Sequence, residues 1–598
     1  MINALLYLIF APIAFGFLMF LLKRLQPAVA ILFALSNLAV AFYVLFSGEA
    51  KFFYLIREVN IALSLKSDAL SSAMVLAAAF LTLFIIIYSA GFFKERPAGF
   101  YGNVLIVLGA SSGVMLSGSL LMLCVFWGAS ALCLYNIVNA GGDRATAAAK
   151  KSFITVGGAD AFLILGIALL FSLTGTFEID AIKLSTEKAL PIFAYLCLLI
   201  AALAKAGAMP FHRWIIDCAP SAPTPVMALL PAGLDKLLGI YLLCRLSLSM
   251  FTITLYSPLS LTLLVLGSCT IVFAVFAALF EHDLKKLLSF HAVSQVGYMI
   301  LGIGTGSFMG IAGALFHLIN NVIYKPCLFM GAGAVEKETG TTNLDSLGGL
   351  SKAMPITFFS MMIAALSIAG IPPLNGFSSK WMIYQALFAA SSRGGVLWMV
   401  WLVCAMVGSA LTLASFMKLI NAVFFGARRG AFTETKASMW IPQVILALIC
   451  VIFGVFAFGI PLKYLILPAV PGVIFVGIWP STPAAILLVL GLLIGFLIFL
   501  IGSLRVVKVS PVFIGGEDIS GSRMSMSGVH FFDSIKDVKI VKKLFEASRR
   551  GSFDIYAGIS KAASRASEVL RGLHTGLLHT YLAWCLLGLV ALLIAFFR

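Results

Sequence analysis

Long apolar runs separated by short polar gaps dominate the chain. A helix needs roughly 20 apolar residues to cross the hydrocarbon core of a bilayer, and runs of this kind recur from Leu5 to Phe597. About 14 to 16 runs reach that length. The first, Met1–Leu22, lacks the basic start and small-residue cleavage site of a signal peptide, so we expect a retained helix. The pattern predicts a polytopic membrane protein.

The same pattern predicts an all-α fold class. Membrane barrels use alternating segments of about ten residues, which this sequence lacks, whereas its runs contain the internal glycine and alanine typical of packed membrane helices. Composition agrees, because 61% hydrophobic residues, 11% charged residues and a mean hydropathy of +1.08 lie outside the range of soluble domains.

Charges divide the chain into parts. A charge at the centre of a membrane helix costs about 3 kcal/mol, and nearly all charges inside apolar runs lie in one stretch, which we expect to be the working core. The predicted parts are three N-terminal scaffold helices (1–100), the core (101–430), further transmembrane helices (431–503), a basic amphipathic segment (504–573) and a final transmembrane helix (574–598).

The net charge of +17 does not indicate nucleic-acid binding. Basic residues lie between the apolar runs or near their ends, where membrane topology and anionic lipid explain them. Examples are Lys94, Arg144, Lys150, Lys151, Arg428 and Arg429.

Sequence motifs for cofactors are missing. The ten cysteines are scattered singly, without C-x-x-C or ligand-like spacing to histidine, so we expect no metal site and no disulfide. The sequence also has no P-loop and no G-x-G-x-x-G after a strand. Any redox cofactor or nucleotide is therefore expected in other subunits.

A weak internal repeat marks two helix breaks. Ala206–Phe211 and Ala369–Leu374 each place glycine and proline inside a long apolar run. Paired breaks in two halves are typical of transporter repeats whose discontinuous helices surround an ion site. Lys205 lies just before the first break and Lys380 just after the second.

Intramembrane lysines supply the candidate chemistry. An ammonium group desolvated among apolar neighbours can exchange a proton near neutral pH. Lys236 and Lys325 also lie well inside apolar runs. The alternative is that such lysines extend along the helix to the membrane surface, which explains one lysine better than a set of four.

His317, Asn321 and Lys325 are spaced four residues apart and therefore share one helix face. Such a row can hold a chain of water molecules. The alternative is a stripe of interhelical hydrogen bonds that only holds the bundle together. Further polar residues within apolar runs are Asp160, His291 and Gln295.

These residues resemble a known family: the antiporter-like proton-pumping subunits of respiratory complex I, energy-converting membrane-bound [NiFe] hydrogenases and Mrp-type cation/proton antiporters. The resemblance covers about residues 65–430. It is most specific in Met209–Trp214, Ala222–Val226, Asp283–Leu288 and Gly370–Phe377. It implies two inverted five-helix repeats, each housing half of a proton path.

The resemblance implies roles position by position. Lys205 matches the family's broken-helix lysine, Lys236 the lysine on the next helix, and Lys380 the terminal lysine or glutamate. The family's central stripe of histidine, histidine and lysine matches the row described above, with Asn321 in place of the middle histidine.

One departure concerns the partner of Lys205. The family usually has a glutamate directly after the tryptophan that matches Trp127, and here that position is Gly128. Asp160 on the next helix is the remaining candidate. Either Asp160 modulates Lys205, or coupling through this half is weakened.

The tail resembles the lateral helix of the family's distal subunits. Asp533–Arg571 repeats apolar residues with a helical period and basic residues between them. It would lie on the membrane surface and span on the order of 60 Å unless Gly551 interrupts it. The alternative is a basic helix that only binds lipid headgroups.

Three segments look closest to the hydrogenase members: Ser378–Tyr384, Leu413–Lys418 and Phe513–Glu517. That branch implies other membrane subunits and a peripheral arm with a [NiFe] site and iron-sulfur clusters that oxidises ferredoxin, in a prokaryotic cytoplasmic (inner) membrane. The chain itself would carry no redox centre. Alternatives are a subunit of a cation/proton antiporter or of NADH-quinone oxidoreductase, or a stand-alone secondary transporter.

Overall fold

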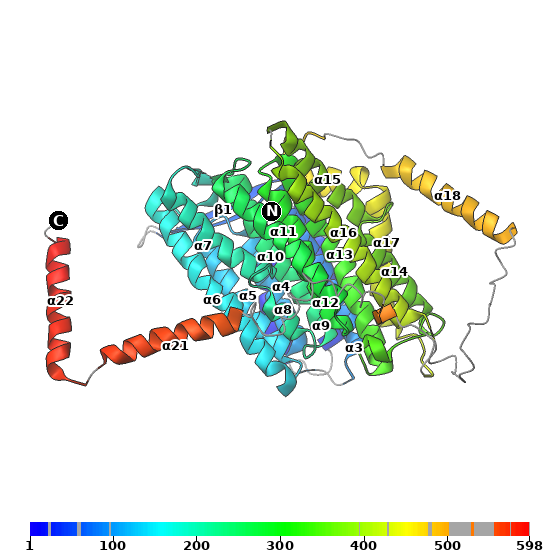
Figure 1. The fold of residues 1–598 in the computed structure, drawn as a ribbon, viewed down its shortest axis with the longest axis horizontal. Coiled ribbons are helices and arrows are strands. Elements are labelled where there is room, and N and C mark those ends of the chain that lie inside the picture. The colour runs from blue at the N-terminus through cyan, green and yellow to red at the C-terminus, as the bar shows by residue number, and fades with distance from the viewer. Residues whose placement is uncertain are drawn as a thin grey trace, which may run out of the picture. The chain divides into compact units, whose positions relative to one another are not determined.

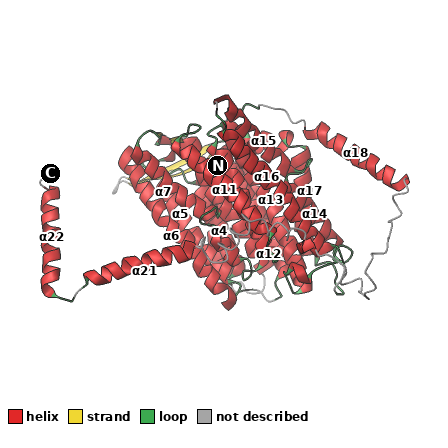
Figure 2. Cartoon of the chain, viewed as in Figure 1, coloured by secondary structure: helices red, strands yellow, loops and turns green. Residues whose placement is uncertain are grey.

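The computed structural model describes residues 1–21, 26–56, 61–94, 97, 99–393, 395–426, 430–475, 481–501, 528–530, 555–574 and 576–596. They fall into two units, 1–533 and 534–598, each considered by itself. Helices predominate among the described residues, and strands form two small two-stranded sheets (Figures 1 and 2). The predicted all-α class is confirmed.

Eleven helices in the described ranges are at least 18 residues long and apolar enough to cross a membrane. Four shorter apolar helices join them, namely Phe100–Leu116, Pro355–Ala369, Thr482–Leu497 and Leu578–Ile594. The eleven meet the length assumed in the prediction of about 14 to 16 spans, and the four others are shorter than that length.

The N-terminal region contains three helices, as expected, and a hairpin that was not predicted. The helices are α1 (Ile2–Met19), α2 (Gln26–Phe46) and α3 (Ala69–Phe92). Strand β1 (Ala50–Ile56) pairs antiparallel with β2 (Ile61–Ser67). The most apolar window of α3 is 83% buried, against 33% for α1 and α2, so α3 belongs to the core of the bundle.

A first series of five helical units follows. Its fourth unit is interrupted, and its fifth contains two π-helical turns, η2 and η3. Short strands β3 (Leu184–Ser185) and β4 (Phe251–Thr252) pair in parallel. The units are α4 (Phe100–Leu116), α5 (Leu120–Asn139), α6 (Asp143–Thr174), α7 (Ala189–Ala206) with α8 (Arg213–Cys218), and α9 (Thr224–Leu229) continued by η2 (Leu230–Leu234), α10 (Asp235–Arg245) and η3 (Leu246–Met250).

A second series also interrupts its fourth unit. The predicted inverted relation between the two series stays a prediction. The units are α11 (Pro258–Leu279), α12 (Leu284–Gly304), α13 (Phe308–Thr339), α14 (Pro355–Ala369) with α15 (Asn375–Ala389), and α16 (Leu397–Phe424), followed by α17 (Ala437–Val455), η6 (Phe458–Ile466) and α18 (Ser481–Ile501).

The C-terminal part of the chain, residues 534–598, contains helix α21 (Ile555–Leu573) and the apolar helix α22 (Leu578–Phe596). Helix α21 is the described part of the predicted amphipathic segment. The rest of that prediction, residues 533–554, lies outside the described residues, as do Phe513–Glu517, Arg428 and Arg429.

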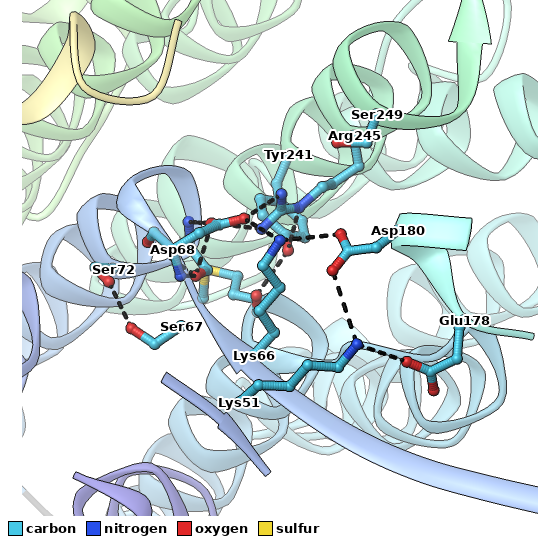
Figure 3. A network of polar contacts seen from close by, with 12 residues as sticks. Lys51, Lys66, Ser67, Asp68, Ser72, Glu178, Asp180, Tyr241, Arg245 and Ser249 are labelled. Carbon is cyan, nitrogen blue, oxygen red and sulfur yellow. Dashed lines mark hydrogen bonds and ion pairs between the residues drawn. The ribbon is translucent and has the colours of Figure 1, made fainter. Parts of the chain in front are cut away.

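An ion-pair network joins the hairpin to the segment after α6 (Figure 3). Lys51 lies 3.2 Å from Glu178, and Lys66 lies 2.9 Å from Asp180. The Lys51 and Asp180 side chains are 46% and 43% exposed. Exposed ion pairs of this kind contribute little individually, so this outer part mainly fixes the position of the hairpin.

The inner end of the network is a buried pair. Arg245, at the end of α10, donates to both carboxylate oxygens of Asp68 at 2.6 and 2.7 Å (Figure 3). Asp68 also accepts from the Ser71 backbone and so caps α3. Burial acts to raise the pKa of the Asp68 carboxyl, but Arg245 and the capped backbone outweigh burial and hold that pKa well below its usual range.

Candidate ion-translocation site

Both predicted helix breaks are present. Helix α7 ends where Gly207 adopts φ +72°, and α14 ends where Gly370 adopts φ +86°. Residues other than glycine rarely adopt this left-handed backbone conformation, and it interrupts the helical pattern, so both helices end at these glycines. Helical structure resumes at Arg213 and Asn375.

Lys205 lies in the last turn of α7 and is fully buried. Its ammonium nitrogen donates to Ser130 Oγ at 2.5 Å and to the Trp127 carbonyl at 3.2 Å. It also lies 4.6 Å from the centre of the Trp127 ring. Helix α5 therefore provides neutral acceptors for this cation.

Asp160 reaches Lys205 only through Trp127. Its carboxylate accepts a hydrogen bond from Trp127 Nε1 at 2.8 Å, and no direct ion pair with Lys205 occurs in the described structure. Asp160 and Gly128 line a cavity of about 480 Å³ between α5 and α6.

Gly128→Glu is expected to be tolerated. A Cβ added at Gly128 meets no atom within 4 Å, so the space for a side chain at the family's glutamate position exists. We expect the variant to fold as the wild type does, measured as the yield of monodisperse protein after size-exclusion chromatography. An aggregated variant would mean that the position does not accept a carboxylate.

Lys236 connects the two series. It is fully buried on α10, and its ammonium nitrogen donates to the Ala292 carbonyl on α12 at 2.8 Å. Residue 292 follows His291, another fully buried polar residue. Lys236 thus reaches from the first series to the centre of the second.

His317 joins three helices. Its Nδ1 lies 2.9 Å from Ser379 Oγ on α15, and its Nε2 lies 3.0 Å from Gln295 Oε1 on α12. The Tyr324 hydroxyl lies 3.3 Å from the same Nε2. A histidine bridged in this way can pass a proton between its ring nitrogens, and it is placed next to Lys380.

Lys325 is fully buried, and its ammonium nitrogen has no hydrogen-bond partner among the described residues. Its nearest aromatic rings are Phe329 at 5.6 Å and Phe416 at 5.9 Å. The His291 ring packs on Phe416 as well, with centroids 4.6 Å apart. Lys325 and His291 therefore share one aromatic wall.

Lys380 caps the second break. It is 2% exposed, and its ammonium nitrogen donates to the carbonyls of Ile368 at 2.9 Å and Ala369 at 3.3 Å. These carbonyls belong to the last turn of α14, where no further helical N–H satisfies them. The negative end of the helix dipole also favours a cation there.

Two buried charges near this path were not predicted as site residues. Asp235 is 1% exposed at the start of α10, and Lys418 is fully buried on α16, where it donates to the carbonyls of Leu279 and Glu281, both at 2.7 Å. The available signal was the position of each charge within an apolar run.

A family profile matches residues 117–412, which include all six predicted site residues; it is described as NADH:quinone oxidoreductase/Mrp antiporter, TM. Curated relatives include Na(+)/H(+) antiporter subunit A1 of Staphylococcus haemolyticus strain JCSC1435, 34% identical over 408 residues, covering 62% of this chain and 50% of the relative. The protein of the same name from Staphylococcus aureus strain Newman is 33% identical over 415 residues, covering 64% and 51%. The chain spans about half the length of the curated relatives it matches.

Solved structures extend the likeness. A chain of the membrane-bound sulfane sulfur reductase, an archaeal respiratory membrane complex, matches with a TM-score of 0.82 and 25% identity, covering 99% of both chains. A chain of the Mrp complex from Dietzia sp. DQ12-45-1b matches with a TM-score of 0.72 and 23% identity over 78% of this chain and 96% of the other. Respiratory complex I from Thermus thermophilus gives 0.68 and 21% over 78% and 97%. The last two likenesses concern the fold alone.

Proposed function

Because this chain belongs to the family of antiporter-like membrane subunits of NADH:quinone oxidoreductases and Mrp antiporters, we propose that it moves protons, or sodium ions, across the membrane as one subunit of a larger complex. Relatives of this kind occur in multisubunit membrane complexes, which makes other membrane subunits its natural partners.

The observation that carries the proposal is a series of ionisable side chains buried across the bundle. Lys205, Lys236, His317, Lys325 and Lys380 are each 2% exposed or less and come from four helices. Burying an unpaired charge is expensive. A bundle held only by packing has no need of four buried lysines, so the series is best explained by ion transfer.

Unsatisfied polar atoms mark where water would complete the path. His291 Nδ1, Gln295 Nε2, Asn321 Oδ1 and Lys325 Nζ lack hydrogen-bond partners among the described residues. Buried polar groups of this kind are usually satisfied by ordered water. Water at these atoms would link Lys236 to His317 and Lys380.

A redox complex is favoured over a cation/proton antiporter. The sulfane sulfur reductase chain covers 99% of this sequence, whereas the Mrp chain covers 78%. The finer proposal is an energy-converting [NiFe] hydrogenase, whose peripheral arm would oxidise ferredoxin. The full-length likeness makes a sulfur-reducing respiratory complex the second candidate.

Purification of the tagged chain from its native membrane tests these alternatives. Co-purified subunits and their metal content would be identified, and the assembly would be reconstituted into liposomes with a pH-sensitive dye. We expect redox turnover to drive proton movement. Nickel with iron supports the hydrogenase, reduction of sulfane sulfur by an assembly without nickel supports the sulfur reductase, and sodium/proton exchange by an active assembly without redox metals would contradict the redox proposal.

Deleting residues 533–598 is expected to leave the bundle inserted but to release partner subunits, because the tail would act as a strap along neighbouring subunits. The measurement is co-purification of partners with the truncated chain. As a matched control, Lys561→Gln with Arg565→Gln keeps α21 but removes headgroup-binding charge, and this variant should keep its partners. Full partner binding and activity without the tail would rule out the strap.

A further inference from the structure

We propose that Asp235 takes over the role of the glutamate that is absent at Gly128: it sets the charge of Lys205 and accepts its proton. This inference deepens the proposed function and rests on it. The residue lies on α10, in the first series, directly before Lys236.

Helix packing places Asp235 near Lys205. Helices α7 and α10 approach closely at Gly239, where an added Cβ would lie 2.5 Å from the Ala202 carbonyl oxygen and 2.6 Å from the Ala206 nitrogen. Asp235 is four residues before Gly239 and therefore on the same face of α10. Lys205 precedes Ala206 on α7, so both charges lie at one helix crossing.

The Asp235 carboxylate has no other use in the described structure. It is 1% exposed, and neither oxygen has a hydrogen-bond partner there. A buried carboxylate without donors is costly unless a proton, a water molecule or a cation serves it. The cation at the same helix crossing is Lys205.

Asp160 is the less direct partner of Lys205, because its carboxylate is already engaged elsewhere. The Asp160 carboxylate already accepts from Trp127 Nε1 and borders the cavity between α5 and α6. Lys205 thus lies between neutral acceptors on α5 and an unsatisfied anion on α10.

The transfer step is balanced. An N–H bond of the Lys205 ammonium breaks, an O–H bond forms on Asp235, and both groups become neutral. Successive helical residues are rotated by about 100°, so α10 directs Asp235 toward α7 and Lys236 toward the Ala292 carbonyl on α12. A deprotonated Lys236 is then the next acceptor, and α10 connects the two series.

Proton pumping per redox turnover in the reconstituted complex tests the assignment. Asp235→Asn is expected to lower pumping by about tenfold or more, since one pKa unit of lost interaction corresponds to a tenfold change. Asp235→Glu should retain more pumping than Asp235→Asn. Asp160→Asn, the matched removal of the other carboxylate, should have a smaller effect. Normal pumping by Asp235→Asn, or a larger loss in Asp160→Asn, would overturn the assignment.

Thermal stability of the intact complex separates this pairing from a packing role. Asp235→Asn leaves a buried ammonium unpaired and should lower the melting temperature, and adding Lys205→Met should restore it. Additive losses would contradict the pairing. This stability readout does not depend on pumping: a wild-type complex that moves no protons would refute the proposed function, while the double variant would still test the pair.

Discussion

Lys380→Met is expected to leave electron transfer running at a reduced rate while proton translocation falls by about tenfold or more, because a relay needs a group that both binds and releases the proton. The Lys380 ammonium group donates hydrogen bonds to the carbonyl oxygens of Ile368 and Ala369, which the second helix break leaves free. Without this ammonium group, a proton on His317 has no acceptor on the remaining part of the proposed path. The measurement is the ratio of pumping to turnover in proteoliposomes.

Lys380→Arg should be nearly as damaging, since a guanidinium does not release its proton in proteins. A lysine that only anchors the helix at the membrane surface would tolerate arginine, so near-normal pumping by this variant would identify Lys380 as an anchor. Lys352→Met removes an exposed lysine in the connection between α13 and α14. That control variant should pump as the wild type does.

Gly376→Ala is expected to prevent assembly of a stable complex. Gly376 lies one turn before Lys380 on α15, and an added Cβ would lie 1.8 Å from the Ser367 carbonyl oxygen. Overpacking costs about 1–3 kcal/mol when side chains can adjust, and here the obstacle is backbone. The loop at this break also packs closely against α17, since a Cβ added at Gly454 would lie 2.0 Å from the Pro373 carbonyl oxygen. The loop therefore cannot easily move away to accommodate a methyl group at Gly376.

Gly128→Ala is the matched control for Gly376→Ala. Both changes add one methyl group to a helical glycine, but the methyl group at Gly128 meets no atom within 4 Å. We expect yield and melting temperature of the complex to fall sharply for Gly376→Ala alone. Equal behaviour of the two variants would show that the second break is looser than its contacts indicate.

Periodicity and local chemistry predicted much of this molecule. The length of the apolar runs predicted the helices, and glycine with proline predicted both helix breaks, because these signals are local in the chain. The proton-relay roles of the six predicted residues stay predictions. The burial of the other five, with Asp160 only partly buried, and the contact of Lys380 with the freed carbonyls agree with the reasoning that led to them.

Other features depend on which helices meet. Asp235 is 30 positions from Lys205, and only the packing of α7 on α10 makes them neighbours. The hairpin of β1 and β2 was missed although a short local signal was present, since apolar and polar residues alternate over Leu63–Lys66 as they do in a strand. Lys418 is held by carbonyls at the end of α11, well over a hundred residues away, a distance across which no sequence pattern operates.

The network in Figure 3 responds unevenly to ionic strength. Dissolved ions screen exposed charges over a Debye length of about 10 Å at 0.1 M salt, and buried pairs much less. Lys51 and Asp180 are almost half exposed, whereas the Arg245 and Asp68 side chains are 8% and 12% exposed. Salt therefore weakens the outer ion pairs of the hairpin, while the pair that ties α3 to α10 holds. In a cell exposed to changing salinity, the hairpin would lose only this small outer contribution, and the contact between α3 and α10 would be preserved.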